Sequence, residues 1–153
     1  MSDIQLLRVK DVMATRTIRI QHDANMYRAA EVVAMSRISD LMVVGEEDKF
    51  IGVLSEADIL RAALPDADEI TAEGRSMDSV FSIFLQKGKE LAKLPILPFV
   101  ITEPIVLDPQ DHVAKAATVM IDRNIRLLPV IKDGKLVGSI SRADVCQAVV
   151  GNS

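Results

Sequence analysis

A serine and an aspartate three positions apart occur twice in the chain, as Ser55 with Asp58 and as Ser141 with Asp144. Each pair stands in the pattern Gly-x-aliphatic-Ser-x-Ala-Asp, which we expect at the junction of a strand and a helix. There the serine hydroxyl and the first helical amides can face an anion, and the aspartate can accept hydrogen bonds from the vicinal hydroxyls of a ribose. The pattern therefore suits a ribonucleotide. The same two residue types also form a capping box, which is a purely structural alternative.

The chain contains an internal repeat around these pairs. The string GVLSEAD at 52–58 returns as GSISRAD at 138–144 with an offset of 86 residues, and IRIQHDANMYRAA at 18–30 matches IVLDPQDHVAKAA at 105–117 with an offset of 87. Gly52 and Gly138 open the two shorter strings, and each leaves space for a flat ring or for a closely approaching backbone. We therefore expect one module, used twice.

Hydrophobic periodicity predicts the order βαββα in each copy. The expected strands are 18–20, 41–44, 50–54, 105–107, 127–131 and 136–140, and the expected helices are 26–36, 56–63, 113–123 and 142–149. Because a unit of this size buries little surface alone, we expect the two sheets to pack face to face about a pseudo-twofold axis, in an α+β fold. The predicted boundaries are module 1 at 1–62, a linker at 63–95 and module 2 at 96–153.

The linker carries an amphipathic helix of its own. Ser76 is the predicted N-cap, and one apolar stripe follows it, formed by Met77, Val80, Phe81, Phe84 and Leu91. Such a stripe can cover the protein's own core. Alternatively, it can contact a second copy of the chain or dock a client protein.

Composition and motifs exclude several classes of function. The net charge is −4 and no basic cluster occurs, so nucleic acid is not an expected partner. We predict neither membrane insertion nor a signal peptide, and hence a cytoplasmic protein. The single Cys146 is expected to be a small buried core residue, and His22 and His112 lack the spacing of metal ligands. With no catalytic motif in the chain, we expect no enzyme, no catalytic residue, no metal and no required cofactor.

The paired motifs, together with VKDVM at 9–13 and IRLLPV at 125–130, resemble a tandem pair of cystathionine β-synthase (CBS) domains. The resemblance implies a regulatory protein that is often a homodimer and acts on a client protein. It implies an adenosyl ligand, such as AMP, ADP, ATP or S-adenosylmethionine, in clefts between the modules. The alternative is an interaction or scaffold module that binds no ligand and dimerises or docks a client through the linker helix.

The resemblance also implies which residues line two unlike clefts. In one cleft, Ser139, Ser141 and Asp144 would face Ile38 and Ser39, and in the other, Val53, Ser55 and Asp58 would face Ile125 and Arg126. Arg126 is a candidate phosphate partner or a solvated surface residue, and Thr102 could contact a ribose or end a turn. Ser39 and Asp40 replace basic residues of the family pattern, and Asp40 would repel a polyphosphate.

Overall fold

A computed structural model of the chain describes residues 7–66, 68–69 and 76–151. In the first module, β1 (Arg19–Gln21), β2 (Asp40–Val44) and β3 (Phe50–Ser55) form one sheet in that order. Strands β1 and β2 are parallel, whereas β2 and β3 form an antiparallel hairpin across the short helix η1 (Glu46–Asp48). Helices α2 (Met26–Ser36) and α3 (Glu56–Ala63) complete the expected βαββα order.

The second module repeats this arrangement with a smaller sheet. Strands β4 (Leu127–Lys132) and β5 (Lys135–Ser141) pair antiparallel, with helices α6 (Val113–Asp122) and α7 (Arg142–Val150) on either side of them in the sequence. The predicted strand at 105–107 is wrong: only Leu107 pairs, in a single parallel bridge to β4. Pro104 has no amide to donate, and Ile105 and Val106 have no strand partner among the described residues.

Each module borrows a segment from the other half of the chain. Helix α1 (Val9–Val12) packs into the core of module 2, where Val9 is fully buried, and Ala14 pairs with Ser139 on β5. Conversely, Ile96 and the short helix η3 (Leu97–Phe99) pack on module 1, and Ile101 pairs with Val53 on β3. The predicted modules 1–62 and 96–153 therefore assign α1 to module 1 and residues 96–101 to module 2, whereas each of these segments packs on the other module.

These borrowed segments explain the repeated glycines. A Cβ atom on Gly52 would lie 2.2 Å from the carbonyl oxygen of Ile101, and one on Gly138 would lie 2.6 Å from the carbonyl oxygen of Ala14. The space at each glycine is therefore filled by a closely approaching backbone, which is one of the two predicted alternatives, and not by a flat ring. Both positions require a residue without a side chain.

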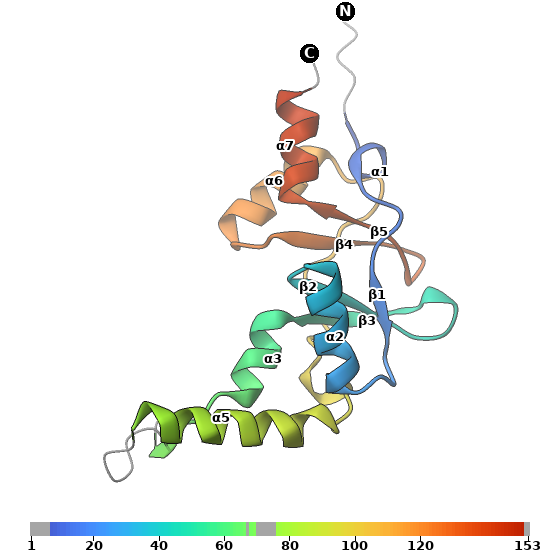
Figure 1. Cartoon of the computed structure of the whole chain (residues 1–153). Coiled ribbons are helices and arrows are strands. Elements are labelled where there is room, and N and C mark those ends of the chain that lie inside the picture. Colours follow the sequence, from blue (N-terminus) through green and yellow to red (C-terminus); the bar gives the residue numbers. More distant parts are fainter. Residues whose placement is uncertain (1–6, 67, 70–75, 152–153) are drawn as a thin grey trace, which may run out of the picture.

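The two sheets pack against each other through one apolar cluster. Met42, Val44, Val53 and Leu136 are buried there, and Phe50, Leu127 and Ile131 surround them. Equivalent backbone contacts recur on both sides, since Glu56 donates to the carbonyl of Ser39 and Arg142 donates to that of Arg126. The predicted sheet-to-sheet, pseudo-twofold arrangement is confirmed (Figure 1).

Helix α5 (Met77–Ala92) lies across the end of module 1, beside α2 and α3 (Figure 1). Ser76 caps it as predicted, because its hydroxyl accepts a hydrogen bond from the amide of Ser79. Leu91 is buried and Phe84 is half-buried against the module 1 core, whereas Met77 and Phe81 are 80% and 58% exposed. The helix therefore covers part of the core and leaves the side chains of Met77 and Phe81 largely exposed. Linker residues 67 and 70–75 lie outside the described part.

Two further features of the described chain bear on the predictions. No helix in it combines the length and the apolar character needed to cross a membrane. The prediction of a buried Cys146 is wrong, because its side chain is exposed on α7. Its neighbour Val145 takes the buried position instead, and successive residues of a helix point about 100° apart.

Candidate functional site

Both repeated Ser-x-x-Asp motifs form the capping boxes that the pattern allows. The Ser55 hydroxyl accepts from the amide of Asp58 at 3.1 Å, and Asp58 Oδ2 accepts from the amide of Ser55 at 3.3 Å. The corresponding distances for Ser141 and Asp144 are 3.1 Å and 2.9 Å. Each box satisfies amides that a helix start would otherwise leave without a partner. The structural alternative is therefore realised in both copies, and any ligand contact comes in addition to it.

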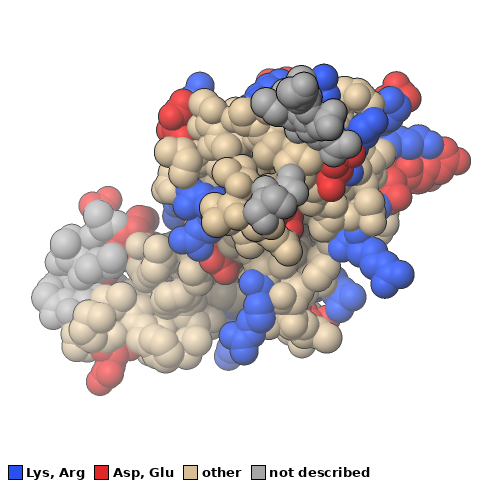
Figure 2. All heavy atoms as spheres, turned by 90° about the horizontal axis from the view of Figure 1, so that it is seen from above, with Lys and Arg blue, Asp and Glu red and all other residues tan. Residues whose placement is uncertain are grey.

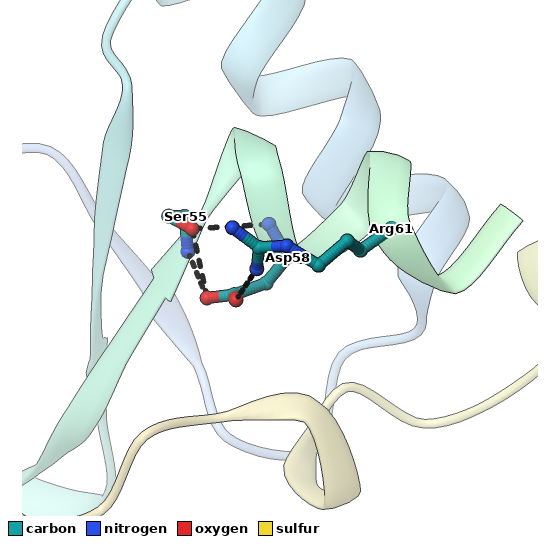
Figure 3. A network of polar contacts seen from close by, with 3 residues as sticks. All are labelled: Ser55, Asp58 and Arg61. Atoms are coloured by element: carbon teal, nitrogen blue, oxygen red, sulfur yellow. Dashed lines mark hydrogen bonds and ion pairs between the residues drawn. The ribbon is translucent and has the colours of Figure 1, made fainter. Parts of the chain in front are cut away.

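The two aspartates differ in their remaining contacts. Asp58 Oδ2 also accepts from the Ser55 hydroxyl at 2.7 Å, and Asp58 Oδ1 forms an ion pair with Arg61 at 2.9 Å (Figure 3). At the position equivalent to Arg61, α7 carries Gln147, and no ion pair to Asp144 occurs among the described residues. Both carboxylate oxygens of Asp58 thus have partners on or next to its own helix. In Asp144, Oδ2 accepts from the Ser141 amide, and Oδ1 can still accept a hydrogen bond from a ligand.

A cleft of about 320 Å³ opens between the modules at the start of α3. Module 1 contributes the end of β3, the start of α3 and the start of β2 with the residue before it, and module 2 contributes the loop between α6 and β4. The lining residues are Ser39, Asp40, Ser55, Glu56, Ala57, Asn124, Ile125 and Arg126. The structure therefore brings together Ser55, Ile125 and Arg126, as the resemblance implied.

Ser39 lies in this same cleft, and not opposite Ser141 and Asp144 as expected. The physical reason is the β2–β3 hairpin, whose register sets Asp40 opposite Ser55. Residues just before β2 and just after β3 must therefore meet at one end of the sheet. Ser39 and Arg126, which were predicted to line two different clefts, consequently line the same one.

The other predicted site residues take different positions. Ile38 is half-buried against the module 1 core, and Val53 is buried in the cluster between the sheets. Ser139 is the only buried polar residue in the described core, and its hydroxyl accepts from that of Thr17 at 2.9 Å. Thr102 is exposed in a bend after Ile101. Thr17 was missed from the sequence, where nothing connects residues 122 positions apart.

Asp40 dominates the electrostatics of the cleft. Burial raises the pKa of its carboxyl above the ordinary value of 3.8; the Ser39 hydrogen bond, at 2.8 Å, acts against this rise. The neighbouring carboxylates of Glu56 and Asp58 raise this pKa further, and the charge of Arg126 lowers it. On the face seen from above, acidic and basic side chains of the described residues are interspersed (Figure 2).

The histidines take no part in a metal site within the described chain, where no group of three or more potential ligands occurs. His112 instead caps α6, because its Nδ1 atom accepts from the amide of Ala114 at 3.0 Å. His22 lines a separate shallow hollow with Asp23, Pro95, Leu97 and Pro98. His112 therefore has a structural role at the start of α6.

Two modules with intertwined segments and a shared cleft define a class of paired βαββα proteins. The CBS domain family matches the chain twice, over residues 9–65 and 96–151, so the chain belongs to that family. The helix α5 lies between the matched regions and is outside both of them.

Known proteins of similar sequence and structure agree with this assignment. The chain is 31% identical to the mitochondrial CBS domain-containing protein CBSX3 of Arabidopsis thaliana, with 84% of the chain covered but only 54% of that relative. Crystal structures of similar fold include CBSX2 of the same plant in complex with AMP, with a TM-score of 0.72, 20% identity and coverage of 94% and 96%. The CBS domain pair of protein MJ0100, in complex with 5′-methylthioadenosine and S-adenosyl-L-methionine, has a TM-score of 0.69, 21% identity and coverage of 97% and 100%.

Proposed function

We propose that this CBS pair is a regulatory protein that binds an adenosine-type ligand in the cleft between its modules and acts on a partner. The observation that carries the proposal is the shared cleft itself, in which Ser55 of one module meets Ile125 and Arg126 of the other. A ligand held by both modules would bind the paired arrangement more tightly than the separated modules. Binding would therefore stabilise their relative placement, which is how a ligand can change what a partner contacts.

The lining of the cleft supports an adenosine ligand with a small anionic group. Arg126 is its cation. At the start of α3 the amides of Glu56 and Asp58 already donate within the protein, and the amide of Ala57 between them, together with the helix dipole, favours an anion. Ile125 offers an aliphatic surface to a base. The solved complexes of similar fold contain AMP or S-adenosyl-L-methionine, which supports the same ligand class.

The size of the cleft favours a compact ligand. A volume of about 320 Å³ stands at the lower end of the range of about 300–1,000 Å³ found for ligand pockets. A nucleoside or a nucleoside monophosphate suits this volume better than a dinucleotide does. A ligand of this kind is a regulator and not a required cofactor.

Thermal unfolding with AMP, ADP, ATP and S-adenosylmethionine tests the proposal. A ligand present at about one hundred times its dissociation constant stabilises the folded state by about 2.7 kcal/mol, which is visible as a higher melting temperature. Arg126→Gln should weaken AMP binding about tenfold or more, because it removes a charge-assisted contact worth about 1.5–3 kcal/mol. Arg123→Gln is the matched control, since Arg123 is exposed nearby but outside the cleft. If no adenosyl ligand raises the melting temperature, the proposal is wrong.

The second site implied by the resemblance, around Ser139, Ser141 and Asp144, remains a prediction. Asp144→Asn provides its test, because an amide oxygen can still accept from the Ser141 amide and preserve the cap. We expect this variant to retain its stability without ligand and to lose affinity for whichever ligand uses Asp144. Equal losses of affinity in Asp144→Asn and Asp58→Asn would show that Asp144 has no special role.

The scaffold alternative also has an observation in its favour. Met77, Phe81 and Leu85 lie along one stripe of α5 and are 80%, 58% and 53% exposed. A second copy or a client could cover this stripe. Phe81→Glu would then abolish the association while leaving adenosine binding unchanged, and sedimentation velocity would measure the self-association. An unchanged sedimentation coefficient together with ligand binding would favour the sensor alone.

A further inference from the structure

The cleft lining contains two acidic side chains, Asp40 and Glu56, and neither forms an ion pair among the described residues. Asp40 is half-buried on β2, and its only hydrogen bond from a side chain is the 2.8 Å contact with the Ser39 hydroxyl. No cation lies within the 4.0 Å ion-pair limit of its carboxylate in the described part of the chain. Asp58, by contrast, is neutralised locally by Arg61 at 2.9 Å.

The balance of charge in the cleft is therefore unusual for a phosphate site. Arg126 is the one cation in the lining, whereas Asp40 and Glu56 supply two carboxylates. Asp40 is the more effective of the two, because it is half-buried while Glu56 is exposed, and water screens a partly buried charge less. The lining can compensate a single phosphate through Arg126, but it repels each additional one.

We propose that Asp40 is the specificity-determining residue of this cleft, and that it limits the adenosine ligand to at most one phosphate. The inference rests on the proposed function, since it concerns the same cleft. It adds the ligand class: adenosine, its 5′-thioethers and its monophosphate are accepted, and the di- and triphosphates are rejected. Asp40 on β2 pairs with Ser55 on β3, and at the equivalent place in the second module Leu127 on β4 pairs with Ser141 on β5. The second module therefore carries no acid at this position.

The test compares adenosine, AMP, ADP and ATP on the full chain by isothermal titration calorimetry. EDTA is included so that no magnesium ion neutralises the phosphates. We expect the affinity of the wild-type protein to fall from AMP to ATP by about tenfold or more, and Asp40→Asn to reduce that ratio by about tenfold or more, because the variant removes one of the two carboxylate charges that repel the added phosphates. Adenosine, which has no phosphate, should bind both proteins equally.

Two variants serve as controls. Asp133→Asn removes the same charge at the opposite end of β4, in a turn with a φ of 52° that asparagine tolerates well, and it should leave the ratio unchanged. Glu56→Gln should change the ratio less than Asp40→Asn, because Glu56 is exposed. Asparagine at position 40 is isosteric with aspartate and can still accept from Ser39, so we expect the variant to fold.

The outcomes separate this inference from the proposed function. If adenosine or AMP binds but the ratio of AMP to ATP affinity is the same in wild type and Asp40→Asn, Asp40 is not the determinant and the cleft still binds its ligand. ATP binding to the wild-type protein as tightly as AMP would also overturn the inference. If none of the four ligands binds either protein, the inference fails, and the proposed function fails as well if S-adenosylmethionine does not raise the melting temperature either.

Discussion

Replacing Gly52 by alanine should damage the contact between module 1 and its borrowed segment. The added Cβ atom would lie 2.2 Å from the carbonyl oxygen and 3.0 Å from the carbonyl carbon of Ile101, and 2.7 Å from Cγ1 of Val100. Non-bonded heavy atoms prefer separations of about 3.5–4.0 Å, so the segment at 100–101 must move by about 1 Å or more. A backbone cannot swing aside as the end of a flexible side chain can.

The magnitude follows from what holds that segment in place. Two backbone hydrogen bonds join Val53 and Ile101, at 3.0 Å and 2.9 Å, and each contributes about 1 kcal/mol net. Overpacking a well-packed region costs about 1–3 kcal/mol more. We therefore expect Gly52→Ala to lower the free energy of unfolding by about 3–5 kcal/mol, which corresponds to a fall in melting temperature of about 6–20 °C for a chain of this size.

Urea denaturation followed by circular dichroism measures this difference. Gly88→Ala is the matched control, because nothing lies within 4 Å of the added atom on α5. Since alanine is the better helix former, Gly88→Ala should raise the free energy of unfolding, by up to about 1 kcal/mol. A free energy for Gly52→Ala within about 0.5 kcal/mol of wild type would refute the account of the borrowed segment, because surface changes without a structural role fall in that range.

Three other predictions concern the cap, the core and the pH dependence. Ser141→Ala should cost about 1 kcal/mol in urea denaturation, because the Asp144 amide loses its acceptor, and an unchanged midpoint would contradict the cap. Met42→Ala should cost about 2–5 kcal/mol, because Met42 is fully buried between the sheets, and a loss below 1 kcal/mol would contradict that packing. Because burial raises the pKa of Asp40 above 3.8, its contribution to stability is fully present below that value and is lost as the pH rises through the raised pKa. Asp40→Asn should therefore gain stability relative to wild type between pH 4 and pH 7, and a constant difference in urea midpoint would show that the shift is absent.

Local signals were sufficient to predict most of the elements. The helices at 26–36 and 56–63 have the predicted bounds, and the paired strands differ from prediction by one or two residues. Serine caps and amphipathic periodicity act within a few residues, so the sequence carries them directly. The strand at 105–107 failed for the opposite reason, since pairing depends on a distant partner and Ile105 and Val106 remain 38% and 39% exposed.

The site was partly predictable from the sequence, and the residues placed differently by the structure depend on strand pairing and on contacts between distant segments. Ser55, Ile125 and Arg126 come from different modules and line one cleft, whereas Val53 and Asp58, predicted beside them, are not in its lining. Ser39 was assigned to the wrong cleft, but the antiparallel hairpin between β2 and β3 already requires that it lie beside Ser55. The contact of Thr17 with Ser139 had no local signal, because it depends on how the borrowed segment crosses β5.

The two copies have kept their framework and changed the side chains that a ligand would meet. Both retain the capping box and the glycine that admits a borrowed backbone, because either loss would cost stability in any copy. Asp58 is tied to Arg61, whereas Asp144 stands three residues before Gln147. Asp40 is likewise charged, whereas the equivalent residue in the second copy, Leu127, is apolar. A sequence repeat therefore identifies the scaffold, but each cleft must be assigned its ligand separately, from the charges that the two copies do not share.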